Sequence, residues 1–335
     1  MRLSRFARFA WAVLAYNVAV ILWGAFVRAS GSGAGCGAHW PMCNGEVIPR
    51  APRLGTIIEF SHRLTSGLAL VLVFGLAVWA MRVEPRGSGV RRASGLAALF
   101  VAGEALIGAG LVLFELVAHD ASLKRALSMC LHLTNTFFLL GALALTAWWA
   151  SGGARIRLRG QGAVPWVLLP AFLGMLVLGA SGAVTALGDT LFPVSSLREG
   201  LQQDTAVAAH FLIRLRIWHP FIATAVGVLA TCGAIFVRVL RPSPPVRRLA
   251  RALIVLFVAQ YFAGLVNVAL LAPTWMQLVH LLLADLVLIA LVLLAAAGLA
   301  CQPMRSRNGP APMSDVPPST SNVAPVTYAP AGDTR

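Results

Sequence analysis

Eight long apolar runs divide this chain, and they constrain its fold more than any other feature of the sequence. They lie near residues 9–28, 58–81, 93–117, 127–150, 164–187, 212–237, 249–271 and 276–300. A transmembrane helix needs about 20 mostly apolar residues, and each run reaches that length. Because lipid offers the backbone no hydrogen-bond partners, such runs span as helices. The sequence therefore predicts an all-α integral membrane protein with eight transmembrane helices.

The composition and the placement of charge support a membrane protein and argue against a nucleic-acid partner. Hydrophobic residues make up 58% of the chain and charged residues only 12%, too few to cover a soluble domain of this size. The net charge of +15 is not gathered on a soluble module that could bind DNA or RNA. Most basic residues instead flank alternate loops, in segments 2–8, 82–92, 155–159, 238–251 and 305–335. By the positive-inside rule both termini lie inside, and lipid is the expected surrounding.

The regions outside the spans indicate where the protein resides. No Arg- and Ser-rich amphipathic segment precedes the first run, which favours a bacterial cytoplasmic (inner) membrane over an organelle. Residues 302–335 are rich in Pro, Ser, Ala and Asn. Such a composition predicts a disordered cytoplasmic tail.

The eight runs form an internal repeat with a period of roughly 155 residues. The segment 24–31 resembles 179–186, and Glu104-Ala-Leu-Ile-Gly108 answers Gln260-Tyr-Phe-Ala-Gly264. Each half holds four spans, an even number, so both halves enter the membrane from the same side. We therefore expect a parallel repeat of two four-helix bundles, residues 1–155 and 156–301, followed by the tail.

Four histidines occupy matching places in this repeat: His62, His132, His219 and His280. Each lies near the start of an even-numbered run, so all four should lie toward the outer face. Histidine is costly in lipid, and a helix bundle can clamp a tetrapyrrole between two imidazoles. The sequence thus predicts two bis-histidine sites. Two alternatives remain: each histidine is a hydrogen-bonded interface residue, or His210 replaces His219 as the ligand.

The two halves differ beside these histidines. Glu59 lies one helical turn before His62, whereas Arg216 holds the matching place before His219. A carboxylate there suits proton transfer or the stabilisation of a developing cation. Arg216 suits the propionates of a heme. The alternative for Glu59 is an interface carboxylate paired with Arg63.

Two further acids and a cysteine pair are candidate functional residues. Glu104 and Asp285 lie inside predicted spans, where acids serve either a proton path or helix packing. Cys36 and Cys43 share the first outer loop, a compartment that permits disulfides. We predict that they are bonded, either as a structural staple or as a redox-active pair; two unpaired thiols are the alternative.

These residues together resemble the heme A synthase family. The resemblance rests on the segment 24–33, on the loop Cys36-Gly-Ala-His-Trp-Pro-Met-Cys43-Asn-Gly, on Glu59-Phe-Ser-His62-Arg63, and on Gly188-Asp-Thr-Leu-Phe-Pro193. It covers about residues 8–300, with the fourfold histidine repeat. It implies an enzyme that converts heme O to heme A, the heme of terminal cytochrome oxidases, by successive oxidation of a ring methyl to formyl with water as the oxygen source.

The resemblance also implies a role for each residue. His62 and His132 would hold the substrate heme, His219 and His280 would ligate a permanent heme b, and Glu59 would stabilise a cation at the reacting methyl. Cys36 and Cys43 match the family's loop pair. Expected partners are heme O, its synthase and an electron acceptor. The alternative function is a bis-histidine diheme electron carrier, which leaves Glu59 unexplained. The sequence does not fix the oligomeric state.

Overall fold

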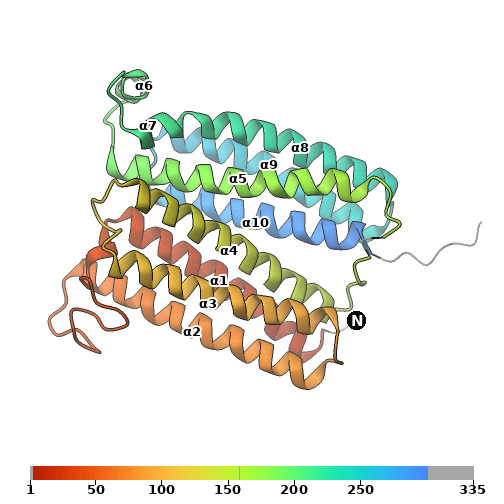
Figure 1. The fold of residues 1–335 in the computed structure, drawn as a ribbon. Helices are drawn as coiled ribbons and strands as arrows, with labels where there is room; N and C mark the ends of the chain where they lie inside the picture. The colour runs from red at the N-terminus through yellow and green to blue at the C-terminus, as the bar shows by residue number, and fades with distance from the viewer. Residues whose placement is uncertain (1–2, 158, 301–335) are drawn as a thin grey trace, which may run out of the picture. The chain divides into compact units, whose positions relative to one another are not determined.

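The structure is a computed structural model that describes residues 3–157 and 159–300 (Figure 1). The predicted tail, 302–335, lies outside these residues. The helices of the described residues are α1 (Arg5–Ala29), α2 (Leu54–Val83), α3 (Gly89–Leu113), α4 (Leu123–Ala150), α5 (Val164–Leu191), α6 (Leu197–Thr205), α7 (Phe211–Arg216), α8 (Trp218–Leu240), α9 (Pro244–Ala269) and α10 (Thr274–Gly298), with a 3-10 turn η1 at Ser32–Ala34. The described part contains isolated bridges but no strand, which confirms the all-α prediction.

Eight helical stretches in the described part are long and apolar enough to cross a membrane. Seven are single helices, and the eighth, Phe211–Leu240, joins α7 to α8. The predicted number of spans is confirmed, and the chain is a multi-pass membrane protein. Some helices begin where the sequence provides a cap: the Ser88 and Ser122 side chains accept backbone N–H bonds at the starts of α3 and α4. A proline lies in the first turn of α5 and of α9.

Each half closes into a four-helix arrangement. In the first half α1, α2, α3 and α4 pack in a ring; in the second, α5, α8, α9 and α10 do so. The central helices α4 and α10 pack against each other, α4 also packs on α5, and α1 on α10. One buried core draws residues from both halves, among them Leu76, Phe137, Leu140 and Leu288. The halves are therefore joined through their most enclosed helices.

The connections lie at two opposite ends of the bundle (Figure 1). We call one the disulfide end; it carries the segment 30–53, the turns 114–122 and 270–273, and the segment 192–210 with α6. The other, the arginine-rich end, carries 84–88, 151–157, 159–163 and 241–243. The candidate site residues on the spanning helices lie nearer the disulfide end, except Asp285, which is close to the middle of α10.

Candidate heme-binding sites and the disulfide loop

The four histidines lie at similar depths near the disulfide end. His62 is in α2, His132 in α4, His219 at the start of α8 and His280 in α10. His210, the alternative to His219, instead caps α7: its Nδ1 accepts from the Leu212 N–H at 3.4 Å. Its ring packs at a tilt against the rings of Phe192 and Phe211. The histidine that faces α10 is His219.

In the second half, the rings of His219 and His280 lie close together. Their centroids are 6.5 Å apart and the ring planes are 77° from parallel. Ser181 Oγ on α5 lies 2.9 Å from His219 Nδ1. Gln260 Nε2 on α9 lies 3.2 Å from His280 Nε2. Each ring is thus held by a neutral polar side chain of a neighbouring helix.

In the first half, His62 and His132 lie close enough for a charge on one imidazole to act on the other. His132 Nδ1 is 3.0 Å from Glu104 Oε2 on α3, although the ring N–H does not point along the line of a hydrogen bond. Glu104 is fixed in turn by Asn135 Nδ2 at 2.5 Å and Thr136 Oγ1 at 3.1 Å, both on α4. Glu104 therefore holds His132 from the side.

Glycines let neighbouring helices approach three of these rings. A Cβ at Gly24 would lie 2.9 Å from His62 Cε1, one at Gly182 would lie 3.2 Å from His219 Cε1, and one at Gly264 would lie 3.0 Å from His280 Cε1. By the histidine ring that each glycine faces, Gly24 thus corresponds to Gly182. The sequence repeat instead matches Gly24 with Gly179, three residues earlier. The sequence match of the repeat was out of register by about one helical turn at this point.

The donor set of these two sites fits a heme clamped by imidazoles. A metal–imidazole bond is about 2 Å long, so two such bonds to one iron place the ring centroids roughly 6 Å apart. The second pair has this spacing. Within the described residues, His62 Nδ1 and His280 Nδ1 are buried with no hydrogen-bond partner. No group of three or more His, Cys, Asp or Glu there gathers as a metal site of its own.

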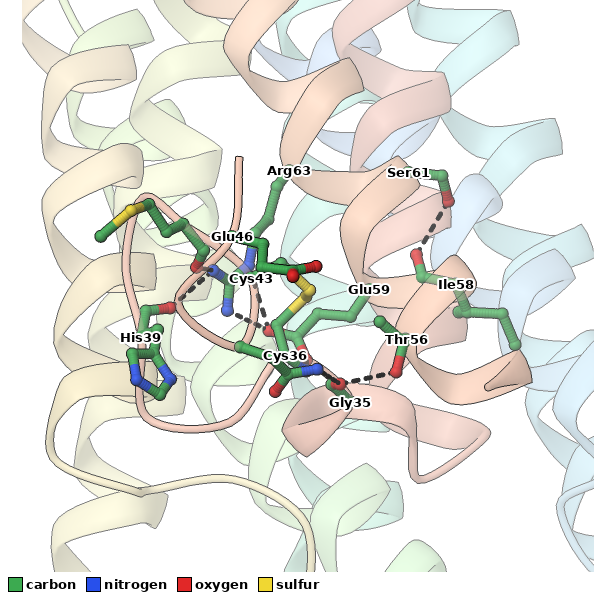
Figure 2. Close-up of a disulfide and its surroundings, with 12 residues drawn as sticks. Gly35, Cys36, His39, Cys43, Glu46, Thr56, Ile58, Glu59, Ser61 and Arg63 are labelled. Carbon is green, nitrogen blue, oxygen red and sulfur yellow. Dashed lines mark hydrogen bonds and ion pairs between the residues drawn. A yellow bond between two sulfur atoms is a disulfide. The ribbon is translucent and has the colours of Figure 1, made fainter. Parts of the chain in front are cut away.

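Glu59 lies at the base of the disulfide loop and is almost fully buried (Figure 2). Its Oε1 accepts from Arg63 Nη2 at 2.5 Å and Nε at 3.2 Å. Its Oε2 accepts from the Cys36 backbone N–H at 2.8 Å. Glu59 is therefore ion-paired with Arg63, as the sequence alternative expected, and its position is fixed from both oxygens.

The loop between α1 and α2 is strapped onto α2. Cys36 and Cys43 form a disulfide. Arg63 Nη1 donates to the backbone carbonyls of His39 at 2.6 Å and Met42 at 2.7 Å, and Thr56 Oγ1 donates to the Gly35 carbonyl at 2.7 Å. One guanidinium thus holds both the loop and Glu59.

Arg216 differs from the sequence interpretation in its surroundings. Its guanidinium is 3.3 Å from Asp189 Oδ1 and 2.7 Å from Asp204 Oδ1, and Nη2 also donates to Gln203. Its side chain is only 10% exposed. Two carboxylates of this chain therefore share the charge that the sequence analysis assigned to heme propionates.

Arg28, for which the sequence pattern predicts no role, joins the halves at the disulfide end. Its Nη1 donates to Thr190 Oγ1 at 2.6 Å and to the Ala186 carbonyl at 2.8 Å on α5, and its Nη2 to Gln277 Oε1 at 2.9 Å on α10. A lone arginine inside an apolar run was the available signal. Asp285, in contrast, is fully buried deeper in α10, and neither of its oxygens has a partner in the described residues.

A family profile described as Cytochrome oxidase assembly protein, COX15-CtaA, matches residues 7–55 and 53–292. The chain belongs to this family. The match covers both histidine pairs, Glu59 and the disulfide loop, so the site lies wholly within the family's part of the chain.

Several curated relatives are similar to this chain. A Protoheme IX farnesyltransferase of Thermus thermophilus is 57% identical over 296 residues, which are 88% of this chain and 49% of that protein. A Heme A synthase of Halalkalibacterium halodurans is 47% identical over 97 residues, 29% of this chain and 33% of that protein. One of Alkalihalophilus pseudofirmus is 45% identical over 95 residues, 28% and 32% of the two chains. The chain spans about half the length of the Thermus relatives it matches.

Proposed function

We propose that this chain is an oxidoreductase that converts heme O to heme A. The observation that carries the proposal is the asymmetry of two otherwise matching histidine pairs: a carboxylate, Glu59, is fixed one turn before His62, whereas Arg216 stands before His219. Family membership and the names of the Heme A synthase relatives support it.

The reaction replaces a ring methyl by a formyl group. One methyl and one water give one formyl, four protons and four electrons. The electrons must leave to an external acceptor, and a membrane quinone, which takes two electrons and two protons, is the class to test first. Heme O is a farnesylated heme, so farnesyl transfer to protoheme is the class of reaction that must supply it, and a heme O synthase is the corresponding partner.

Each side chain has a definite task in this proposal. His62 and His132 hold the substrate heme by its iron. His219 and His280 hold a heme b, which supplies one-electron redox chemistry when bound. Glu59 stabilises positive charge at the methyl carbon as electrons leave it, and Arg63 with the Cys36 N–H fixes the carboxylate beforehand. Arg216 remains a candidate to bind a heme propionate. To do so, its guanidinium would have to give up the ion pair with Asp189 or with Asp204.

We further propose that the disulfide end faces the outside of a bacterial cytoplasmic membrane. The arginine-rich end would then face the cytoplasm, as the positive-inside rule requires. Both heme sites would lie near the outer face, and the disulfide would lie in an oxidising compartment.

The test is the heme content of the full chain purified from bacterial cells that make heme O but no heme A. Extraction, chromatography and mass spectrometry should give heme B together with heme A or a hydroxylated heme O. Glu59→Ala should keep heme B and lose the product. Glu46→Ala in the same loop, where the Glu46 side chain contacts the exposed Arg50, should keep the product. Product formation by Glu59→Ala would remove Glu59 from the mechanism.

Two other functions would give different hemes in the same experiment. Heme B alone, at two per chain, would indicate the bis-histidine electron carrier. The Thermus relatives favour a second enzyme activity by their name, Protoheme IX farnesyltransferase. In cells without a heme O synthase, heme O made by this chain would show that activity.

His219→Met or His280→Met should change the b-type spectrum, and a normal spectrum in both variants would refute the heme b ligands.

A further inference from the structure

The four histidines differ in the chemistry of the group that holds each ring. His132 is held by the carboxylate of Glu104, His280 by the amide of Gln260 and His219 by the hydroxyl of Ser181. His62 Nδ1 has no partner in the described part of the chain. Within residues 3–157 and 159–300, only one of the two histidine pairs therefore has an acidic side chain against an imidazole.

The carboxylate of Glu104 is held in place within the first bundle. Asn135 Nδ2 donates to Oε1 and also to the Phe100 carbonyl at 2.8 Å, which binds α4 to α3. Thr136 Oγ1 reaches Oε2. A Cβ at Gly103 would lie 2.9 Å from Asn135 Oδ1, so glycine is what permits this close approach. Glu104 lies against Nδ1 of His132, so Nε2 is the ring nitrogen that would bind an iron.

Gln260 is the counterpart of Glu104 in the second bundle, but it is neutral, less constrained and lies against Nε2 of its histidine where Glu104 lies against Nδ1. Its Nε2 is 3.2 Å from His280 Nε2, and its Oε1 is buried without a partner among the described residues. The repeat thus preserves a polar side chain against one ligand histidine and changes its charge between the halves.

A carboxylate against a ligand imidazole makes that imidazole a stronger donor to its metal. A stronger axial donor stabilises Fe(III) and lowers the reduction potential of a heme. We propose that Glu104 is a positioning residue that orients His132 toward the first heme iron and gives that iron a lower reduction potential than the iron held by His219 and His280. The difference has the sign that favours loss of electrons from the substrate site. This inference rests on the heme ligands of the proposed function.

The experiment is a redox titration of the purified full chain, in which the absorbance of each heme is followed against potential. The second-half signal is the one that His280→Met changes. Glu104→Gln, which copies the amide of Gln260 in the other half, should raise the reduction potential of the first heme. The expected shift is roughly tenfold in favour of Fe(II), equal to 59 mV for a one-electron couple. The second heme should not move. Gln260→Glu should shift the second heme in the opposite direction and leave the first unchanged.

Thr136→Val is the matched control, because it removes one hydrogen bond to Glu104 and leaves the carboxylate against His132. Both potentials should stay as in the wild-type chain. Glu104→Gln protein whose first heme keeps its potential, or whose two hemes move equally, would overturn the inference. If Glu104→Gln fails to fold, Gln260→Glu decides, and unchanged potentials there overturn it.

The titration also separates this inference from the proposed enzyme activity. A chain that binds two hemes but makes no heme A disproves the activity, yet the effect of Glu104→Gln on potential still tests the inference. A wild-type chain that binds no heme, measured before any variant is made, would overturn both.

Discussion

At Gly24, Gly182 and Gly264, the missing Cβ leaves room for a histidine ring from the neighbouring helix. We predict that Gly24→Ala displaces His62 and lowers heme occupancy in the first half, while the b-type spectrum of the second half persists. Heme per chain, measured by extraction, checks this. Gly75→Ala in α2 is the control, because its Cβ would meet nothing within 4 Å and alanine favours a helix by about 1 kcal/mol. Full first-half occupancy in Gly24→Ala would show that the ring has space to move.

Arg63 and Arg50 give a second comparison at the residue scale. Arg63 and Glu59 form a buried ion pair, with side chains 12% and 5% exposed, and loss of one partner of such a pair costs about 3–5 kcal/mol. The Arg50–Glu46 pair is 92% and 42% exposed, and exposed pairs contribute about 0–1 kcal/mol. Arg63→Ala should therefore lower the thermal unfolding temperature clearly and Arg50→Ala hardly at all. Equal effects would mean that Glu59 finds another partner.

Asp285 is a fully buried ionisable residue whose carboxyl oxygens have no polar contact in the described residues. Neither oxygen has a partner in the described residues, and burying an unpartnered polar or charged group costs free energy. Asp285→Asn should therefore retain or raise thermal stability. A large loss of stability would reveal a partner for the carboxyl, and purified protein in detergent is sufficient for the measurement.

Among the elements, the disulfide loop depends on a close backbone approach to the start of α2. A Cβ at Gly35 would lie 2.4 Å from the Gly55 carbonyl oxygen, and backbone cannot move aside as a side chain does. Gly35→Ala should therefore lift the loop from α2 and break the Cys36 N–H bond to Glu59. Hydrogen exchange of peptides covering 32–53 should become faster. Gly33→Ala, whose Cβ would make an ordinary 3.7 Å contact with Val117, should leave the exchange unchanged; equal acceleration by both would contradict the argument.

For the whole molecule, Arg28 is a charged tie between the halves at the disulfide end. A hydrogen bond from a charged group contributes about 1.5–3 kcal/mol to the free energy of unfolding. Arg28→Met removes three such bonds, so it should lower the stability of the full chain by several times the contribution of one neutral hydrogen bond. Gln277→Ala, which removes only one of the acceptors, should have a smaller effect. Thermal unfolding in detergent provides the ranking, and an equal loss in the two variants would show that Gln277 alone carries the tie.

The orientation in the membrane is also a property of the whole chain. In a chain whose cysteines outside residues 36–43 are replaced by serine, Val207→Cys at the disulfide end should react with a membrane-impermeant thiol reagent in intact cells. Arg86→Cys at the arginine-rich end should react only after the membrane is opened. Both positions are exposed. The reverse labelling pattern would invert the proposed topology.

Much of this architecture follows from local sequence. The spans were predicted from the lengths of the apolar runs, because lipid permits little but helix there. The pairing of histidines between helices was expected from the repeat, and the structure brings His219 and His280 together. The Cys36–Cys43 bond is present as expected from the shared loop. Each of these depends on neighbours in sequence or on a period that recurs along the chain.

The partners of the charged side chains could not be obtained in this way. Arg216 pairs with Asp189 and Asp204, and Arg28 reaches α5 and α10, because helix packing brings together positions that are distant in sequence. The one-turn difference between Gly24–Gly179 and Gly24–Gly182 has the same origin, since small residues in a helix look alike until a facing ring selects one of them. The sequence by itself determined the helical spans and the family, and it predicted the repeat and the residues that we propose carry the chemistry. Only the tertiary structure decided which charges neutralise one another and which carboxylate, Glu104 or Glu59, touches a histidine, because these contacts depend on the rotation of each helix against its neighbours.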